Sequence, residues 1–244
     1  MIGYVASLDE RKNSVEIAYL CGFLTHYFLD RECHPYVYWQ TDYLNKRKDY
    51  LEKHYQFEND IDVALLRIMR NTTPYEFSRV SQIKINPAER ERVCRMLHYS
   101  MHRTYEETRI TKRGIHLAIL SIQKEQHFFK LCSGKLKTAI ETVENYFVGQ
   151  SYLASLIPGV DHEISEDPLN LRHLEWKNPW KSEKVSNASF PEMMEKAAGN
   201  FALSVYLMED YLYEFRGDKQ VWNLLTWRIG NASYHSGLDW NIPS

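Results

Sequence analysis

The stretch AYLCGFLTHYFLDRECHPYVYW, residues 18–39, places His26, Asp30 and His34 four positions apart, and its first part belongs to the most apolar segment of the chain, residues 17–29. Side chains four apart lie above one another on the same face of an α-helix, so these three can point to one side. A carboxylate in so apolar a segment is costly to bury unless it has a partner. The stretch therefore predicts a core helix with a polar face that can bind a metal.

A second stretch, EKHYQFENDIDVALL at residues 52–66, repeats the spacing with His54 and Glu58. Two such helices side by side would form a cup of imidazole and carboxylate donors. Zinc accepts this donor set at about 2.0–2.2 Å. The alternative is solvated structural pairing, because a chain with 10 His and 32 Asp and Glu produces such pairs by chance. The predicted zinc ligands are His26, Asp30, His34, His54 and Glu58.

The sequence carries signals for both ends of the first of these helices. Ser7 and Glu10 have the spacing of a capping box, and the apolar run that follows predicts a helix over residues 8–31. Pro35 is expected to end it, because proline lacks the N–H that a helix interior needs.

The remaining segments are also helical in pattern. The second stretch predicts a helix that begins near Leu44 or Leu51 and ends near Arg70. Capping and periodicity predict further helices at residues 74–80, from Asn86 and Pro87 onward, at 112–130, at 135–147, from Ser189 to about Phe215 and at 218–226.

The connection over residues 157–188 is rich in proline and polar residues and is expected to be long and irregular. No internal repeat and no convincing alternation of apolar and polar residues indicates a strand. We therefore expect an all-α fold in which residues 1–244 form a single domain.

Composition narrows the function. A formal net charge of −2 gives no electrostatic reason to bind nucleic acid or an anionic membrane surface. No apolar run approaches the roughly 18 residues of a membrane span, and the first residues do not resemble a signal peptide. The cysteines form no CxxC pair, which fits a reducing compartment, so we expect a cytoplasmic protein. No pattern indicates an oligomeric state. The cysteines are Cys21, Cys33, Cys94 and Cys132.

The segments GFLTHYFLD, CHPYVYW and HYQFENDID carry a family resemblance. The chain resembles the zinc-dependent phospholipase C family, all-helical metalloenzymes related to fungal single-strand nucleases. That family has HxxxD on one core helix, a further His often followed by Pro, and HxxxE on the next helix, in the order found here. The resemblance is looser toward the end, at SFPEMMEKAA and NASYHSGL.

The resemblance implies a set of roles. Family members bind three zinc ions; His34, His54 and Glu58 would complete one protein ligand set, and His26 and Asp30 would supply part of a second, with Asp30 bridging toward a third. The family's other ligands and its proposed general base come from an N-terminal segment. No His precedes His26 here, and Asp9, near a predicted helix start, is better explained by the helix dipole. We therefore expect this chain to lack the family's N-terminal portion, and we assign no catalytic residue.

The implied function is a zinc-dependent phosphoric ester hydrolase of the phospholipase C type, in which metal-activated water cleaves a phospholipid or another phosphodiester. The alternative is a truncated, non-catalytic zinc-binding helical domain. A nuclease-like activity is disfavoured by the lack of basic patches, and a di-iron bundle by the lack of paired ExxH motifs.

Other residues near these motifs leave alternatives open. Cys33 could compete with His34 as a thiolate ligand. Asp60 and Asp62 could orient His54 or lie on an exposed helix face. The aromatic residues that follow His34 could line a pocket for an acylglycerol or a quaternary ammonium group, or fill the core. These are Tyr36, Tyr38 and Trp39.

The remaining histidines are weaker candidates. His98 and His102 are four apart and could clasp a metal, but no acid accompanies them in register. The isolated histidines are expected to lie at the surface or to be hydrogen-bonded structurally. These are His116, His127, His162, His173 and His235.

Overall fold

The structure, a computed structural model, is mostly helical, as expected, and contains one small hairpin. It describes residues 1–8, 14–45, 49–73, 76–77, 84–105, 107–131, 135–149, 152–155, 157 and 164–240. In chain order the elements are α1 (Ile2–Ala6), α2 (Ser14–Gln40), a 3₁₀ turn (Tyr43–Asn45), α3 (Tyr50–Arg70), α4 (Pro87–Thr104), α5 (Lys112–Leu131), α6 (Lys135–Phe147), α7 (Tyr152–Ser155), β1 (Trp176–Asn178), β2 (Lys181–Ser186), α8 (Phe190–Glu209), a π-helical turn (Asp210–Glu214) and α9 (Lys219–Ile229).

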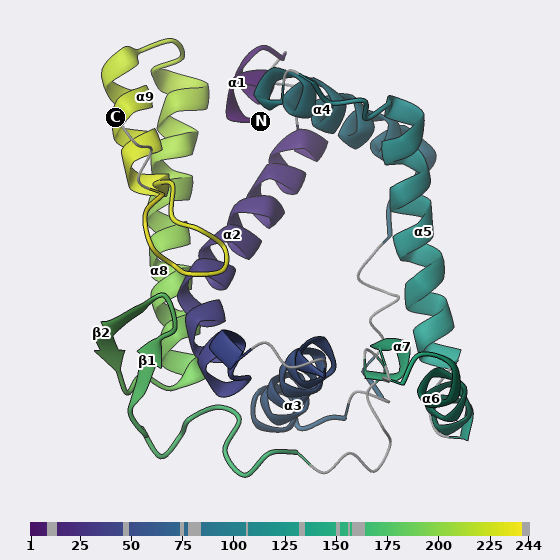
Figure 1. The fold of residues 1–244 in the computed structure, drawn as a ribbon. Coiled ribbons are helices and arrows are strands. Elements are labelled where there is room, and N and C mark those ends of the chain that lie inside the picture. The colour runs from purple at the N-terminus through teal and green to yellow at the C-terminus, as the bar shows by residue number, and fades with distance from the viewer. Residues whose placement is uncertain are drawn as a thin grey trace.

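Helix α2 organises the fold. It runs alongside α8 and also contacts α1, α3, α4 and β1 (Figure 1). Its N-terminal half contributes Leu20 and Leu24 to a core cluster with side chains of α4, α8 and α9. Its C-terminal half contributes Tyr36 and Val37 to a second cluster with α3, β1 and the start of α8. Because α2 is packed along most of its length, the side chains on its polar face have a rigid support.

Pro35 does not end the helix as expected; α2 continues through it to Gln40. A proline at this position leaves the carbonyl of Arg31 without its usual helical donor. The C-terminal loop, defined here as residues 231–240, packs against that point: a Cβ on Gly237 would lie 2.3 Å from the Arg31 carbonyl oxygen and 3.2 Å from Cγ of Pro35. Tertiary packing of the loop and of the two core clusters outweighs the helix-breaking tendency.

The predicted helix starts at Asn86 and Ser189 are confirmed. Each side chain accepts a hydrogen bond from the backbone N–H three residues later, where a Glu returns the bond, so both are complete capping boxes. Asp218 caps α9 in a similar way, by accepting from two backbone N–H groups. Glu10 lies outside the described residues; among those described, Leu8 is not helical and the first long helix spans Ser14–Gln40.

The expectation of an irregular connection over residues 157–188 is wrong in its second part, where β1 and β2 form an antiparallel hairpin. Strand β2 is almost entirely exposed, so it carries no alternating apolar pattern that the sequence could reveal. The hairpin is anchored by Trp176, which is buried and donates from Nε1 to the carbonyl of Ala188 at 3.1 Å. This anchor positions the hairpin beside the C-terminal half of α2.

Candidate metal centre

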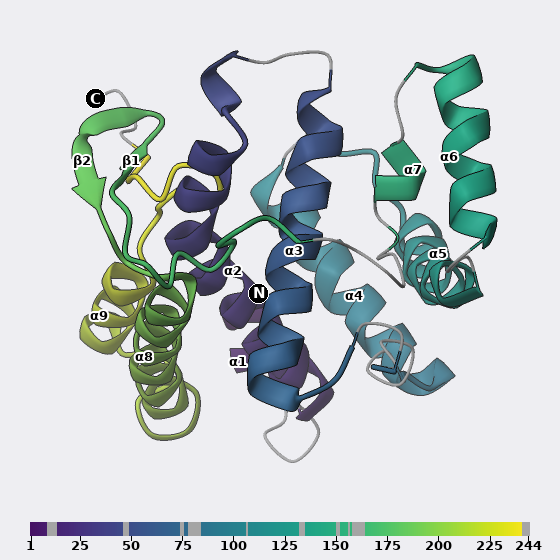
Figure 2. The same cartoon turned by 90° about the horizontal axis from the view of Figure 1, so that it is seen from below.

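Helices α2 and α3 lie side by side (Figure 2). They bring three of the five predicted ligands together. His34 on α2 and His54 and Glu58 on α3 each offer a donor atom, and these atoms all lie within 4.8 Å of one another. Oε1 of Glu58 is 3.2 Å from Nε2 of His54 and 3.7 Å from Nε2 of His34. Two imidazole nitrogens thus face one carboxylate, which is a zinc-type donor set with room for a further ligand.

The imidazole of His34 is held in one orientation by the C-terminal loop. Its Nδ1 lies 2.8 Å from the backbone carbonyl oxygen of Tyr234. A carbonyl can only accept, so Nδ1 carries the proton and the lone pair of the neutral ring is on Nε2, which faces Glu58. This is the tautomer that a metal ligand needs, and a hydrogen bond of this kind also makes the ligand more basic.

His54 is oriented in a comparable way by its own helix. Its Nδ1 lies 3.2 Å from the hydroxyl of Tyr50, one turn earlier on α3. Its side chain is only 10% exposed, while that of Glu58 is 39% exposed. The two imidazoles therefore form the buried wall of the centre, and the carboxylate lies on its open side.

Glu58 and His34 shift each other's pKa in opposite directions. Burial raises the pKa of Glu58, but hydrogen bonds from His34 and His54 outweigh it and bring the pKa to about 2. Burial lowers the pKa of His34, yet the nearby carboxylates and the Tyr234 carbonyl raise it overall above 6.5. The Glu58 carboxylate is therefore ionised at neutral pH, and a divalent cation can pair with it.

His26 and Asp30 lie next to this group and form a pair of their own. Nε2 of His26 is 3.0 Å from Oδ2 of Asp30, and the side chain of His26 is 68% exposed whereas that of Asp30 is 14% exposed. Burial is the largest influence on the pKa of Asp30 and raises it, although His34 and His26 lower it. Asp30 shares a cavity of about 310 Å³ with His34 and Glu58. The roles of His26 and Asp30 as metal ligands stay a prediction.

Cys33 is a poor candidate for a thiolate ligand. Burial is the main reason why its pKa rises to about 12, so its sulfur stays protonated at neutral pH. The side chain is buried in the second core cluster and forms part of the wall of the cavity beside Asp30.

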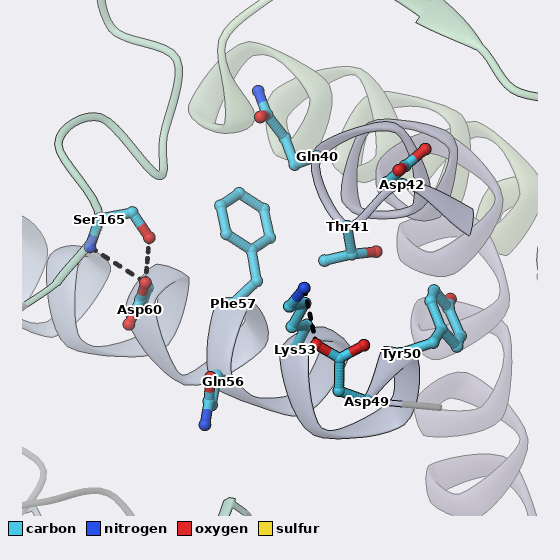
Figure 3. Close-up of a pocket in the computed structure, with 10 residues that line it drawn as sticks. All are labelled: Gln40, Thr41, Asp42, Asp49, Tyr50, Lys53, Gln56, Phe57, Asp60 and Ser165. Atoms are coloured by element: carbon cyan, nitrogen blue, oxygen red, sulfur yellow. Dashed lines mark hydrogen bonds and ion pairs between the residues drawn. The ribbon is translucent and has the colours of Figure 1, made fainter. Parts of the chain in front are cut away.

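Asp60 connects α3 to the segment that precedes β1 and is buried, which excludes an exposed helix face for this residue. Its Oδ2 accepts from the backbone N–H of Ser165 at 3.0 Å and from the hydroxyl of Ser165, as Figure 3 shows. Both residues line a separate cavity of about 270 Å³, which also includes Tyr50. Asp62, by contrast, is exposed and borders the cavity shared by Asp30 and His34.

The three aromatic residues after His34 have different surroundings. Tyr36 is fully buried and packs against Trp176 and Phe190, so it belongs to the core. Trp39 is 39% exposed. Tyr38 lies beside the centre, with its ring centroid 4.9 Å from that of His54.

The other histidine pair does not form a comparable centre. The ring centroids of His98 and His102 are 4.3 Å apart, and Nε2 of His102 is 2.9 Å from the carbonyl oxygen of Ile110. Among the described residues, no acid joins them in a group of three donors. His162 and the side chain of His127 lie outside the described part of the chain.

Sequence reasoning missed the contribution of the C-terminal loop. The backbone carbonyl of Tyr234 accepts the hydrogen bond from His34. His235 was expected to be isolated, but its Nδ1 is 2.6 Å from the hydroxyl of Tyr38. These contacts span about 200 positions, so no local spacing could reveal them. The only sequence signal was the loose likeness of NASYHSGL to a closing segment of the family.

Comparison with known proteins agrees with this geometry. Residues 2–108 match the family model described as zinc dependent phospholipase C, and they include all five predicted ligands. No curated protein and no solved structure gives a match. Within the described residues, no helix is both long and apolar enough to cross a membrane. The similarity to the zinc-dependent phospholipase C family thus covers residues 2–108, the part of the chain that carries helices α2 and α3.

Proposed function

We propose that this protein is a zinc-dependent phosphoric ester hydrolase of the phospholipase C type, and that His34, His54 and Glu58 hold a catalytic zinc. The observation that carries the proposal is the convergence of these three donors from two packed helices within 4.8 Å. Three protein ligands are typical of catalytic zinc sites, where a fourth position serves water or substrate. Zinc bound there would lower the pKa of a bound water to about 7 and polarise a phosphoryl oxygen.

The residues around the centre suit this chemistry. The Tyr234 carbonyl and the Tyr50 hydroxyl hold the two imidazoles so that both Nε2 atoms face Glu58. The neighbouring cavity of about 310 Å³ is lined by Asp30, His34 and Glu58 and also by apolar side chains. A substrate with a charged phosphodiester next to an apolar portion matches such a lining, and the family implies a phospholipid. The apolar side chains are Leu29, Val37, Ile61 and Phe190.

We expect zinc-loaded protein to cleave phosphatidylcholine vesicles into diacylglycerol and phosphocholine, because the bond broken lies on the glycerol side of the phosphate. Lipid products are measured by chromatography, and bis(4-nitrophenyl) phosphate serves as a soluble diester. Hydrolysis should stop with 1,10-phenanthroline and return with added zinc. Protein that binds one zinc per chain and cleaves none of phosphatidylcholine, phosphatidylethanolamine, phosphatidylglycerol and the soluble diester would instead be a non-catalytic zinc-binding domain.

Zinc affinity should depend on pH through His34. Because folding raises the pKa of His34, zinc must displace a proton from this ring below that pKa, and affinity should fall there by about tenfold per pH unit. Glu58, with a pKa of about 2, contributes nothing to this trend between pH 5 and 8. Titration calorimetry from pH 5.5 to 8 measures the dissociation constant. A dissociation constant that does not change across this pH range would show that His34 is not a ligand.

Metal-free protein should show its own pH dependence. Because folding raises the pKa of His34, its stabilising effect is complete below pH 6.5 and is lost as pH rises through the folded value. Folding lowers the pKa of Glu58, so its effect is present above 4.5 and is lost as pH falls toward 2. Urea unfolding of the metal-free protein should therefore show opposite slopes in the two ranges.

A further inference from the structure

The C-terminal loop is held firmly against α2. The loop crosses α2 in Figure 1, and Ala232 and Asp239 pair across its base. The Asn178 side chain in β1 donates from Nδ2 to the carbonyl of Ser236 at 2.7 Å, and Gly237 packs against α2. A side chain at the tip of this loop therefore has a defined position.

His235 is at that tip and faces the metal centre. Its ring is nearly parallel to that of His34, with an interplanar angle of 15° and 6.1 Å between centroids. Its Nδ1 is 2.6 Å from the hydroxyl of Tyr38. When the hydroxyl donates this bond, the proton of the neutral ring is on Nε2. Within the described part of the chain, Nε2 of His235 has no hydrogen-bond or ion-pair partner.

The position of His235 suits a contact with a substrate bound to the metal rather than with the metal itself. His235 is not among the donors that lie within 4.8 Å of one another, so it is too far out to join His34, His54 and Glu58 around one ion. A phosphoryl group at such an ion has further oxygens that extend outward, and an N–H fixed beside the ion can donate to one of them. The nearby Asp30 carboxylate is already paired with His26 at 3.0 Å.

We propose that His235 is a substrate-binding residue, and that its Nε2–H donates a hydrogen bond to a phosphoryl oxygen held at the His34–His54–Glu58 centre. The proposal rests on the proposed function and adds a residue from outside the part of the chain that matches the family. Tyr38 is a positioning residue, because its hydroxyl sets which nitrogen of His235 carries the proton.

Inorganic phosphate is the probe for this role. We expect zinc-loaded His235→Ala to bind zinc with unchanged stoichiometry and affinity but to bind phosphate about tenfold more weakly or worse in titration calorimetry, since hydrogen bonds to charged groups are strong. His235→Gln keeps an N–H donor and should recover part of the affinity. His98→Ala, which removes a histidine outside the centre, is the matched control and should bind phosphate normally.

A second measurement needs neither zinc nor activity. In metal-free protein, ¹⁵N NMR should show His235 mainly as the Nε2–H tautomer, and Tyr38→Phe should redistribute the proton between the two nitrogens. His235→Ala with wild-type phosphate affinity, in protein that binds zinc and hydrolyses diesters, would overturn the role of His235 alone. Loss of zinc from His235→Ala would also overturn it, and wild-type protein that binds no zinc would overturn both proposals.

Discussion

Glu58→Ala should lose tight zinc binding. Both imidazoles of the centre face this carboxylate, at 3.2 Å from His54 and 3.7 Å from His34. Altering a partner that merely orients a metal ligand typically costs 10–100-fold in metal affinity, so removing a ligand should cost more than about 100-fold. Metal analysis by mass spectrometry after gel filtration and competition with a chromophoric chelator measure the loss.

The same variant should lose the stabilisation that zinc provides. A ligand at a thousand times its dissociation constant stabilises the folded state by about 4 kcal/mol, and this zinc-dependent increase should be absent in Glu58→Ala. The pKa of His34 should also fall in the metal-free variant, because burial lowers that pKa and Glu58 opposes it. Thermal unfolding with and without zinc and NMR titration of His34 give the two readouts.

Glu52→Ala is the matched control. Glu52 is on the same helix and accepts a hydrogen bond from Gln56 at 3.1 Å, but it does not belong to the group of three donors. It should bind zinc as the wild type does. If Glu58→Ala retained one zinc with unchanged affinity, the assignment of the metal centre would be wrong.

Gly237→Ala should displace the C-terminal loop and weaken the zinc site from a distance. The added Cβ would lie 2.3 Å from the backbone oxygen of Arg31, which cannot move without distorting α2, and the residue has a φ of +60°. The overlap and the strained backbone together should cost about 1–3 kcal/mol. Displacement also removes the Tyr234 carbonyl from Nδ1 of His34, so zinc affinity should fall about 10–100-fold.

Gly217→Ala separates the two effects. Gly217 also has a positive φ, +84°, but a Cβ there would meet nothing within 4 Å. This variant should show only the backbone cost of about 1–2 kcal/mol, with unchanged zinc affinity. Urea unfolding and zinc titration are compared for both variants. Equal zinc affinity in the two would mean that the loop does not orient His34.

The helices and the candidate ligands were largely readable from the sequence. The capping boxes at Asn86 and Ser189 and the spacing of His54 and Glu58 depend on residues three or four positions apart, which a helix brings together by its own geometry. Pro35 shows where local reasoning failed. Its helix-breaking tendency is real, but the packing of α2 on both sides and the close approach of Gly237 outweigh it.

Local spacing was sufficient to predict the mostly helical fold and the pairing of His54 with Glu58, since both follow from helix periodicity. It was not sufficient for the packing of α2 against α3, for the hairpin with its exposed second strand, or for the approach of the C-terminal loop. The orientation of His34 depends on a carbonyl 200 positions away. Such contacts form only when distant segments bury their apolar faces together, and a backbone carbonyl leaves no mark on the identity of the residue that carries it.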